Sequence, residues 1–583
     1  MDPARAGSVH VFFRTAAAVR PSFLAAPEAD MRIRHLSLLA LALLAACGGS
    51  DAPGNEGAQK QASDEPQVPE QQRYGGTIVV ASIGPIPDIN PLTSTDYTGN
   101  QVQQFVLFMP LITYDEKFEP VPYLARSWEV NADSTELTFH LRNDVYWHDG
   151  KKTSAHDVKY SYDMARIPAT AFPNTAFWTH YRDATVVDSF TIRIGMRPHA
   201  DFMDPWRSFS PVPRHILEGT APSAMQTHPF GTRTPVGNGP FKFVEHLPQQ
   251  RWVFAANENF PRELGGRPYA DRLVYRIIPE PTTLMAELLR GNIDYYIAPT
   301  AEQAQEIDAS PVARIVSFPD RQFLMLGWNE KREMFKDVRV RRALTMGLDR
   351  EAIVRAVRRG YGELGNSTIP PFYWNHDPQA GADLRHDTAA AKRLLAEAGW
   401  RDRNGDGILE NAQGQPFRFT IITNQGNRER EDIVVIVQSQ LRRLGIDVRT
   451  QLMEWGSMLD RIQDVEKRDY DAVLIAWVTE FRIDDTDLFH CEKLKEPFQW
   501  VSYCNPQTDR LLDTLPTIVD RNASRPVWNQ YQRQIAAEQP YTILYFTRRL
   551  EGVHERLRNV NPDARGDWVN ARTWYLLPNM RNR

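Results

Sequence analysis

Apolar and polar positions alternate in the first half of the chain. Leu137, Phe139 and Leu141 are separated by polar residues, and the same alternation returns at 190–196. This period of two is typical of strands that bury one face. The stretch 113–209 is therefore predicted to be β-rich, with several short strands joined by turns.

The second half shows apolar positions at helical spacing between short apolar runs. Asp349 and Asp387 stand where N-caps of two helices are expected, and Gly360 and Gly399 stand where those helices should end. The remaining predicted elements are a helix at 433–444 and strands at 417–421, 446–452 and 471–477. Strands that alternate with helices at this spacing predict an α/β lobe around a parallel sheet buried on both faces.

The N-terminal segment has the pattern of an export signal. Arg32 and Arg34 precede an apolar run, 36–46, of eleven residues that ends in small residues before Cys47. A helix that spans a bilayer needs about 20 apolar residues, so this run is too short to remain as an anchor. Residues 1–46 are thus predicted to be a signal segment. Within it, Met31 is the predicted initiator, so residues 1–30 would precede the true start of the protein. The pattern resembles a bacterial lipoprotein signal, which would make Cys47 the lipidated first residue. An ordinary signal peptide with a chance cysteine is the alternative.

Residues 47–73 contain almost no large apolar side chains. Gln, Glu, Pro, Ala, Ser and Gly dominate the segment, so it cannot bury enough surface to offset the entropy of ordering. We predict a flexible linker between the lipid and a folded part that begins near Tyr74, with a first strand at 77–80.

Length and charge limit the classes of protein. About 510 residues follow the linker, which is too many for one hydrophobic core and predicts two or three lobes. The net charge is −5 with mixed signs along the chain, which argues against a nucleic-acid partner. No later segment is long and apolar enough to span a membrane. Aromatic residues make up 10% of the chain, which suits a core and also a site for an organic ligand.

Two cysteines remain once Cys47 is assigned to lipid. Cys491 and Cys504 are close in sequence, and an exported chain with one remaining pair predicts a disulfide. Such a bridge contributes roughly 3 kcal/mol in the chain-entropy model. Two free buried thiols are the alternative.

Motifs of catalysis and of cofactor binding are absent from the sequence. It has no G-x-S-x-G, H-E-x-x-H, Walker A or C-x-x-C motif, so we expect no catalytic residues and no cofactor. The run from Asp402 to Gly407 copies the first half of a calcium loop, but Gln413 stands where a bidentate Glu is required and Glu410 falls at the ninth position. A turn built from Asx and Gly residues is the preferred interpretation, without a metal, and calcium is the alternative.

Three stretches resemble family 5 of the bacterial extracellular solute-binding proteins, the dipeptide- and oligopeptide-binding components of importers. The likeness covers 75–583. Its most specific parts are PYLARSW at 122–128, LTFHLR at 137–142, VYWHDG at 145–150, AHDV at 155–158, PVGNGPF at 235–241, LRGNID at 289–294, FKDVRVRRAL at 335–344 and LDR at 348–350.

The resemblance implies a two-lobed periplasmic-binding-protein fold of the α/β class, type II, in its large form with an extra β-rich subdomain. The boundaries that it implies are lobe 1 at 74–112, 210–323 and 544–583, the inserted subdomain at 113–209, and lobe 2 at 324–543. The strands and helices expected from periodicity fall where this layout puts them.

The resemblance also implies where a ligand binds. In peptide-binding relatives an aspartate three residues after a strand-ending Trp receives the peptide's amino terminus. Here that Trp is Trp477 and the position holds Glu480, a departure that keeps the carboxylate on a longer stem. Asp484 and Asp485 are alternatives for this role, or they are simply solvated loop charges. A carboxylate is needed because an ammonium that loses water without a partner is costly.

Four further positions match positions of relatives. Trp455 matches a side-chain pocket residue, with core packing as the alternative, and Arg428 matches an arginine that pairs with the terminal carboxylate. An exposed helix start is the alternative for Arg428. Cys491 and Cys504 match a disulfide beside the cleft of some dipeptide-binding relatives.

The sequence therefore predicts a lipid-anchored receptor of the periplasm or cell envelope. It would be a monomer that captures a short peptide between two lobes and delivers it to the membrane permease of an ABC transporter, and not an enzyme. The same fold with a nickel chelate, haem, an opine or an oligosaccharide as ligand is the second hypothesis, and a secreted hydrolase is the third.

Overall fold

A mixed sheet of eleven strands runs through the computed structural model, which describes residues 68–581. Its strands lie in the order β15 (Asp447–Met453), β14 (Arg418–Asn424), β16 (Ala472–Val478), β12 (Ala313–Trp328), β17 (Tyr541–His554), β11 (Tyr295–Ile297), β1 (Thr77–Ser82), β10 (Arg272–Ile277), β9 (Arg251–Ala256) and β8 (Phe241–Leu247), and β13 (Gly362–Glu363) pairs with β17. The strand predicted at 77–80 is confirmed as part of β1. The fold is of the predicted α/β class.

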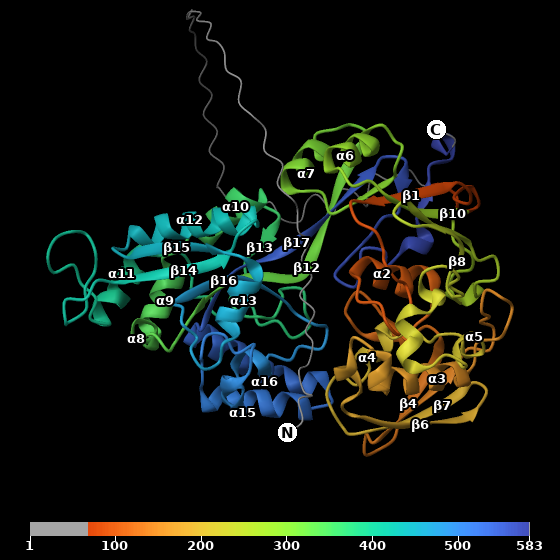
Figure 1. The fold of residues 1–583 in the computed structure, drawn as a ribbon, viewed down its shortest axis with the longest axis horizontal. Helices are drawn as coiled ribbons and strands as arrows, with labels where there is room; N and C mark the ends of the chain where they lie inside the picture. The colour runs from red at the N-terminus through yellow and green to blue at the C-terminus, as the bar shows by residue number, and fades with distance from the viewer. Residues whose placement is uncertain (1–67, 582–583) are drawn as a thin grey trace, which may run out of the picture. The chain divides into compact units, whose positions relative to one another are not determined.

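Two long antiparallel strands, β12 and β17, connect the two groups of elements that Figure 1 shows to either side of them. Their register shifts between Pro319 and Phe323. At this shift the Thr547 hydroxyl donates to the Asp320 carboxylate at 3.0 Å and to the Gln322 carbonyl at 3.2 Å. Hydrogen bonds of a side chain thus replace the backbone hydrogen bonds between β12 and β17 at the point where these strands pass from one group of elements to the other.

The prediction of a parallel sheet in the second half is confirmed for three strands. β14 pairs in parallel with both β15 and β16. The next strand of the sheet, β12, is not among the predicted strands, and it pairs with β16 antiparallel. The prediction that the sheet is buried on both faces is wrong at β15. This is an edge strand, and its Leu452 is 46% exposed.

Helices cover both faces of this part of the sheet. Leu324, Leu326 and Trp328 of β12 pack with one group of helices, and the alternating Phe323 and Met325 pack with another. The first group is α9 (Val338–Met346), α10 (Arg350–Arg358), α11 (Thr388–Glu397) and α12 (Arg428–Arg442), and the second includes α13 (Trp455–Gln463) and α16 (Arg521–Glu538). The shorter helices nearby are α8 (Glu333–Lys336), α14 (Thr486–Phe489) and α15 (Pro506–Thr514).

The two predicted helix caps are present. The Asp349 side chain accepts the N–H of Ala352 at the start of α10, and the Asp387 side chain accepts the N–H of Ala390 at the start of α11, each at 2.8 Å. An N-cap carboxylate satisfies one of the backbone donors that the first helical turn leaves without a partner. Both predicted helices are therefore confirmed.

A separate antiparallel sheet occupies the stretch predicted to be β-rich. Its order is β4 (Ala125–Val130), β5 (Glu136–Leu141), β7 (Thr191–Met196) and β6 (Tyr181–Asp188). The alternating residues Leu137, Phe139 and Leu141 are buried, which confirms the strand prediction. A hairpin and four helices accompany this sheet: β2 (Ile112–Tyr114), β3 (Pro120–Pro122), α2 (Tyr97–Val102), α3 (Ala155–Arg166), α4 (Asp204–Ser208) and α5 (Arg214–Leu217).

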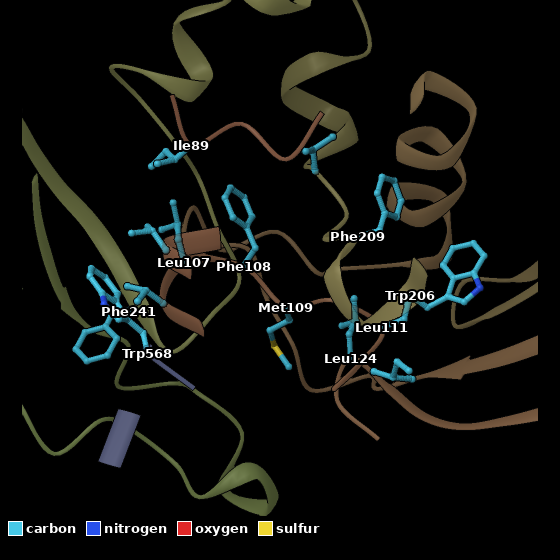
Figure 2. Close-up of a cluster of buried hydrophobic side chains, with 14 of the residues drawn as sticks. Ile89, Leu107, Phe108, Met109, Leu111, Leu124, Trp206, Phe209, Phe241 and Trp568 are labelled. Atoms are coloured by element: carbon cyan, nitrogen blue, oxygen red, sulfur yellow. The ribbon is translucent and has the colours of Figure 1, made fainter. Parts of the chain in front are cut away.

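One hydrophobic cluster joins this small sheet to the large one. Figure 2 shows Phe108 and Met109 between Phe241 and Trp568 on one side and Trp206 on the other. All five side chains are at most 1% exposed. The small sheet therefore shares its core with the large sheet. The remaining elements are α6 (Pro281–Leu289), α7 (Ala301–Asp308), β18 (Leu557–Arg558) and β19 (Tyr575–Leu576).

The last residue of the predicted linker contacts the folded part. Arg73 lies over the rings of Tyr269 and Tyr575, with its guanidinium carbon 5.7 and 5.3 Å from their centroids. These cation–π contacts tie the end of the predicted linker to the fold. Cys47 and the predicted signal segment lie outside the described residues.

The PVGNGPF motif allows two backbone segments to approach closely. A Cβ atom on Gly237 would lie 1.9 Å from the Leu107 carbonyl oxygen, so no larger residue fits there. The N–H groups of Asn238 and Gly239 both donate to that oxygen, and the Asn238 side chain accepts the N–H of Met109 at 2.9 Å. This motif is structural.

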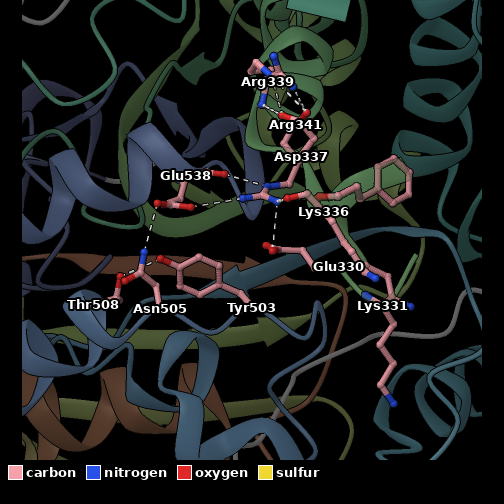
Figure 3. Close-up of polar contacts among 12 residues, drawn as sticks. Glu330, Lys331, Lys336, Asp337, Arg339, Arg341, Tyr503, Asn505, Thr508 and Glu538 are labelled. Atoms are coloured by element: carbon pink, nitrogen blue, oxygen red, sulfur yellow. Dashed lines mark hydrogen bonds and ion pairs between the residues drawn. The ribbon is translucent and has the colours of Figure 1, made fainter. Parts of the chain in front are cut away.

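Arg341 gives the FKDVRVRRAL motif a structural role. Its guanidinium is 2% exposed and donates to the carbonyls of Phe335 and Glu538 at 2.7 and 2.8 Å. It also pairs with the carboxylate of Glu330 at 3.1 Å (Figure 3). Burial raises the pKa of Glu330 to about 8, against the effect of the neighbouring arginine. The motif thus holds α8, α9 and α16 together.

Candidate ligand-binding site

Trp477 and Glu480 lie at the end of β16, beside the register shift of β12. Trp477 pairs with Phe323 across the two strands. Its half-buried indole packs edge-on against Trp500 at 5.5 Å and against Phe498 at 6.0 Å between ring centroids. The aromatic wall around Trp477 therefore comes from a segment that follows it in the chain.

A disulfide closes that segment. Cys491 and Cys504 are bonded across a sequence separation of 13, and Phe498 and Trp500 stand between them. The bridge restricts the segment that presents the two rings to Trp477.

Glu480 offers its carboxylate to solvent. The side chain is 73% exposed, and its Oε2 lies 3.5 Å from Nη1 of Arg321. The same Nη1 donates to the Thr479 carbonyl at 2.9 Å. A carboxylate has acceptor positions for several donors, so Glu480 can receive a cationic group in addition to this ion pair.

Asp484 and Asp485 differ sharply in surroundings. Asp484 is exposed and accepts the N–H of Thr486 at 3.1 Å. Asp485 is 3% exposed, and one of its oxygens accepts the hydroxyls of Thr368 and of Tyr531, the latter at 2.6 Å. Burial raises the pKa of Asp485 to about 6. Asp485 is therefore engaged inside the fold, and Asp484 is the accessible one.

Arg428 occupies the first turn of α12 and its side chain is 93% exposed, 3.8 Å from Asp432. Two positions on, Arg430 is 2% exposed and donates to the Asn424 side chain at 2.8 Å. The Arg430 guanidinium carbon lies 5.8 Å from the centroid of the Trp455 ring. The structure thus brings Trp455 together with Arg430 and not with Arg428.

The helical spacing of the sequence contains the signal for Arg430. Val434 and Val437 of α12 are buried, and Arg430 lies four and seven residues before them on the same face. Burial lowers the pKa of Arg430 to about 10. Trp455 itself is half-buried at the start of α13, where the Glu454 side chain caps the helix.

Phe481 is a site neighbour that the sequence reasoning missed. Its ring lies between two guanidinium groups, with the carbons of Arg207 and Arg321 at 3.6 and 4.3 Å from the ring centroid. Arg207 precedes β12 in the chain and belongs to the other side of the site. No local pattern announces this contact, because the two residues are far apart in sequence.

Two small cavities flank these residues. One is lined by Asp201, Arg482, Asp484 and Trp528, among others, and a second by Tyr114, Arg207 and Arg565. Each cavity is about the size of a water molecule, so the two border the candidate site without forming a cleft for a peptide.

Asp402, Asp406 and Glu410 each have an oxygen within 4.8 Å of the others, an arrangement that could hold a cation. Both Asp402 oxygens accept backbone N–H groups, from Gly405 at 2.7 Å and from Gly407 at 3.0 Å. These are the hydrogen bonds of an Asx-type turn. The loop lies between α11 and β14 and not beside Trp477.

Comparison with known proteins defines the class. The model of the bacterial extracellular solute-binding proteins, family 5, matches residues 119–491. The oligopeptide-binding protein AppA of Bacillus subtilis is 32% identical over 554 residues, which covers 94% of this chain and 98% of that protein. The chain is thus a solute-binding protein, and it belongs to family 5 of the bacterial extracellular solute-binding proteins. Among residues 68–581, no helix has the length and apolarity to cross a bilayer.

Solved structures agree with this assignment. The AppA structure in complex with a nonapeptide has a TM-score of 0.67 and covers 86% of this chain and 99% of its own. NikZ from Campylobacter jejuni, in complex with Ni(L-His), is 24% identical with a TM-score of 0.67 and covers 87% of this chain and 100% of its own. The second likeness concerns the fold alone. The predicted two-lobed type II fold is confirmed.

Proposed function

We propose that this protein captures short peptides outside the cytoplasm and delivers them to the permease of an ABC transporter. The observation that carries the proposal is the accessible Glu480 carboxylate beside Trp477 in a chain 32% identical to an oligopeptide-binding protein. A peptide brings an ammonium, a carboxylate and apolar side chains, and this site offers a partner for each. The protein acts as a binding component and not as an enzyme.

Each site residue has a role in this proposal. Glu480 receives the peptide's ammonium, with Asp484 as the nearest accessible substitute. Trp477 and Trp455 form apolar pocket walls, and Arg428 meets the terminal carboxylate. Asp485 supports the loop from inside the fold. The register shift of β12 and β17 is the hinge, because closure of two lobes needs a few residues that absorb the change.

The proposal includes attachment to a membrane through lipid on Cys47, after removal of 1–46, and export to the cell envelope as a monomer. The predicted linker at 47–73 then connects the lipid to the fold. The proposed division into two lobes and an inserted subdomain keeps the boundaries given in the sequence analysis.

A panel of defined peptides from two to nine residues, titrated into the purified protein in a calorimeter, tests the ligand class. We expect at least one length to bind with a micromolar or lower Kd. Mass spectrometry of the small molecules released on unfolding provides a second measurement. Release of a nickel chelate, haem, an opine or an oligosaccharide, without peptide binding, would establish the alternative ligand.

A further inference from the structure

A buried arginine contacts the segment that forms the aromatic wall beside Trp477. Arg468 is 2% exposed and lies between α13 and β16, the strand that carries Trp477 near its other end. Its Nη2 donates to the Glu496 carbonyl and its Nη1 donates to the Ser502 hydroxyl, each at 3.1 Å. A guanidinium can make two such contacts at once because its donors form a rigid fork.

The two contacts lie on either side of the wall's rings in the chain. Phe498 and Trp500 stand between Glu496 and Ser502, and the whole run lies between the two bridged cysteines. The disulfide joins the ends of this segment, whereas Arg468 joins two points inside it. Loss of the guanidinium would therefore free the part of the segment that carries the rings, even with the disulfide intact.

The backbone around Arg468 is itself held in place. The side chain of Asn329, a buried residue just after β12, donates to the carbonyls of Arg468 and Tyr470 at 2.9 and 2.6 Å. The Tyr470 hydroxyl in turn donates to the Trp500 carbonyl. The φ of Arg468 is 40°, in the left-handed region that carries a steric cost for residues other than glycine. Such a conformation persists where the surroundings fix it, and here it aims the guanidinium at the wall segment.

The charge of Arg468 is costly at this position. Burial lowers its pKa, and the two acceptors of its guanidinium are a carbonyl and a hydroxyl, both neutral. Packing alone would not need an arginine, because an apolar side chain of similar size fills a buried space without that cost. The contribution of Arg468 therefore lies in its hydrogen bonds to the wall segment.

We propose that Arg468 is a positioning residue of the ligand site, which holds Phe498 and Trp500 against Trp477 so that the site prefers a ligand with an aromatic side chain. This rests on the proposed function in one respect, the peptide as ligand. Contacts between aromatic rings depend on the distance and angle of the rings. A ligand ring packed on this wall therefore responds to a displacement of Phe498 or Trp500 more than a methyl group does.

Arg468→Gln tests the preference for an aromatic side chain. A tryptophan scan of the tightest-binding peptide of the calorimetry panel, on wild type, identifies the position at which tryptophan binds better than alanine. Arg468→Gln should weaken the tryptophan peptide about tenfold, a change that the loss of ring contacts can produce, and should weaken its alanine counterpart little. A general loss of stability would weaken both peptides alike, so the ratio separates positioning from stability.

Three further variants control this test. Ser502→Ala removes one acceptor and leaves Arg468 in place, so it should shift the same ratio in the same direction even if Arg468→Gln does not fold. Lys467→Gln changes the adjacent residue, whose side chain is 79% exposed, and should alter neither affinity. In a Trp500→Ala background Arg468→Gln should add little, because both changes act on one wall.

Amide hydrogen exchange of the ligand-free protein measures the segment itself. The amides of 492–503 should exchange roughly tenfold faster in Arg468→Gln than in wild type, as when one or two hydrogen bonds are lost. Unchanged exchange in both Arg468→Gln and Ser502→Ala would overturn the positioning role. Equal losses for the two peptides, or a scan in which no position favours tryptophan, would also overturn it. If wild type binds no peptide, the proposed function is refuted, whereas faster exchange at 492–503 still supports Arg468 as the residue that positions the segment.

Discussion

Arg321 and Glu480 form an ion pair at 3.5 Å in which the two partners have very different exposure, 18% for the arginine and 73% for the glutamate. The buried arginine is also held by the Thr479 carbonyl and by the ring of Phe481. Its position is therefore fixed, while the Glu480 carboxylate faces the solvent. An incoming ammonium would add to this pair without having to displace the arginine.

Arg428 is expected to make a small contribution to ligand affinity. Its guanidinium is 93% exposed, and exposed ion pairs contribute about 0.2–1 kcal/mol. Arg428→Gln should therefore weaken a peptide with a free carboxylate at most about fivefold. Calorimetry at low salt measures the loss, and an amidated peptide should show none. Arg355→Gln, which changes an exposed arginine on α10 that also lies near an acidic side chain four residues away, is the matched control. Equal losses for both peptides would remove Arg428 from the site.

The disulfide between Cys491 and Cys504 should contribute to stability and to the wall around Trp477. The double variant Cys491→Ser/Cys504→Ser is expected to lose about 3 kcal/mol of unfolding free energy, as for a loop of about 15 residues. Urea unfolding measures this loss. Alkylation without reduction should label neither cysteine in wild type. Two labelled thiols in protein freshly isolated from the cell envelope would contradict the bridge.

Asp485 should make the protein less stable as the pH rises. Its pKa of about 6 in the fold lies above the ordinary 3.8, so the protonated form is favoured by folding and that contribution is lost between about pH 4 and 6. At pH 7.5, Asp485→Asn should unfold at a higher urea concentration than wild type, because its free energy of unfolding is larger by up to about 3 kcal/mol. This difference should shrink at pH 4. Asp484→Asn, an exposed neighbour, should show no such trend. A stability difference independent of pH would contradict the burial argument.

Cys47 should be the first residue of the mature protein. Intact mass of the membrane-fraction protein is expected to show a diacylglyceryl cysteine with nothing before it. Cys47→Ala should move the protein to the soluble fraction, because the chain then lacks its anchor. A Cys47→Ala protein that stays membrane-bound would contradict the lipid assignment.

Local patterns in the sequence predicted local structure well. The alternation at 137–141 and the caps at Asp349 and Asp387 depend on contacts within a few residues, and the structure contains these elements. The pairing of β16 with β12 depends on residues about 150 positions apart, as between Phe323 and Trp477, and periodicity carries no information about it. This is why the sequence predicts the parallel strands β14, β15 and β16 but not the antiparallel partner β12.

The site was predictable only in part for the same reason. Trp477 lies near the end of a recognisable strand and Glu480 follows that strand, so a resemblance could point to them. Phe481 depends on Arg207, Tyr114 and Phe118, which reach it from a distant segment. Arg428 and Arg430 are two residues apart and differ in burial because they face opposite sides of α12. The buried face of that helix is readable from its apolar spacing.

The role of Glu480 is tested most directly by calorimetry on four combinations, wild type and Glu480→Gln, each with a free and an N-acetylated form of the same peptide. A hydrogen bond to a charged group contributes about 1.5–3 kcal/mol. Glu480→Gln should therefore weaken the free peptide roughly tenfold to a hundredfold. The acetylated peptide should bind wild type poorly and lose little more in the variant, which gives a large coupling between the two changes. A coupling near zero would contradict the assignment of the ligand's ammonium to Glu480.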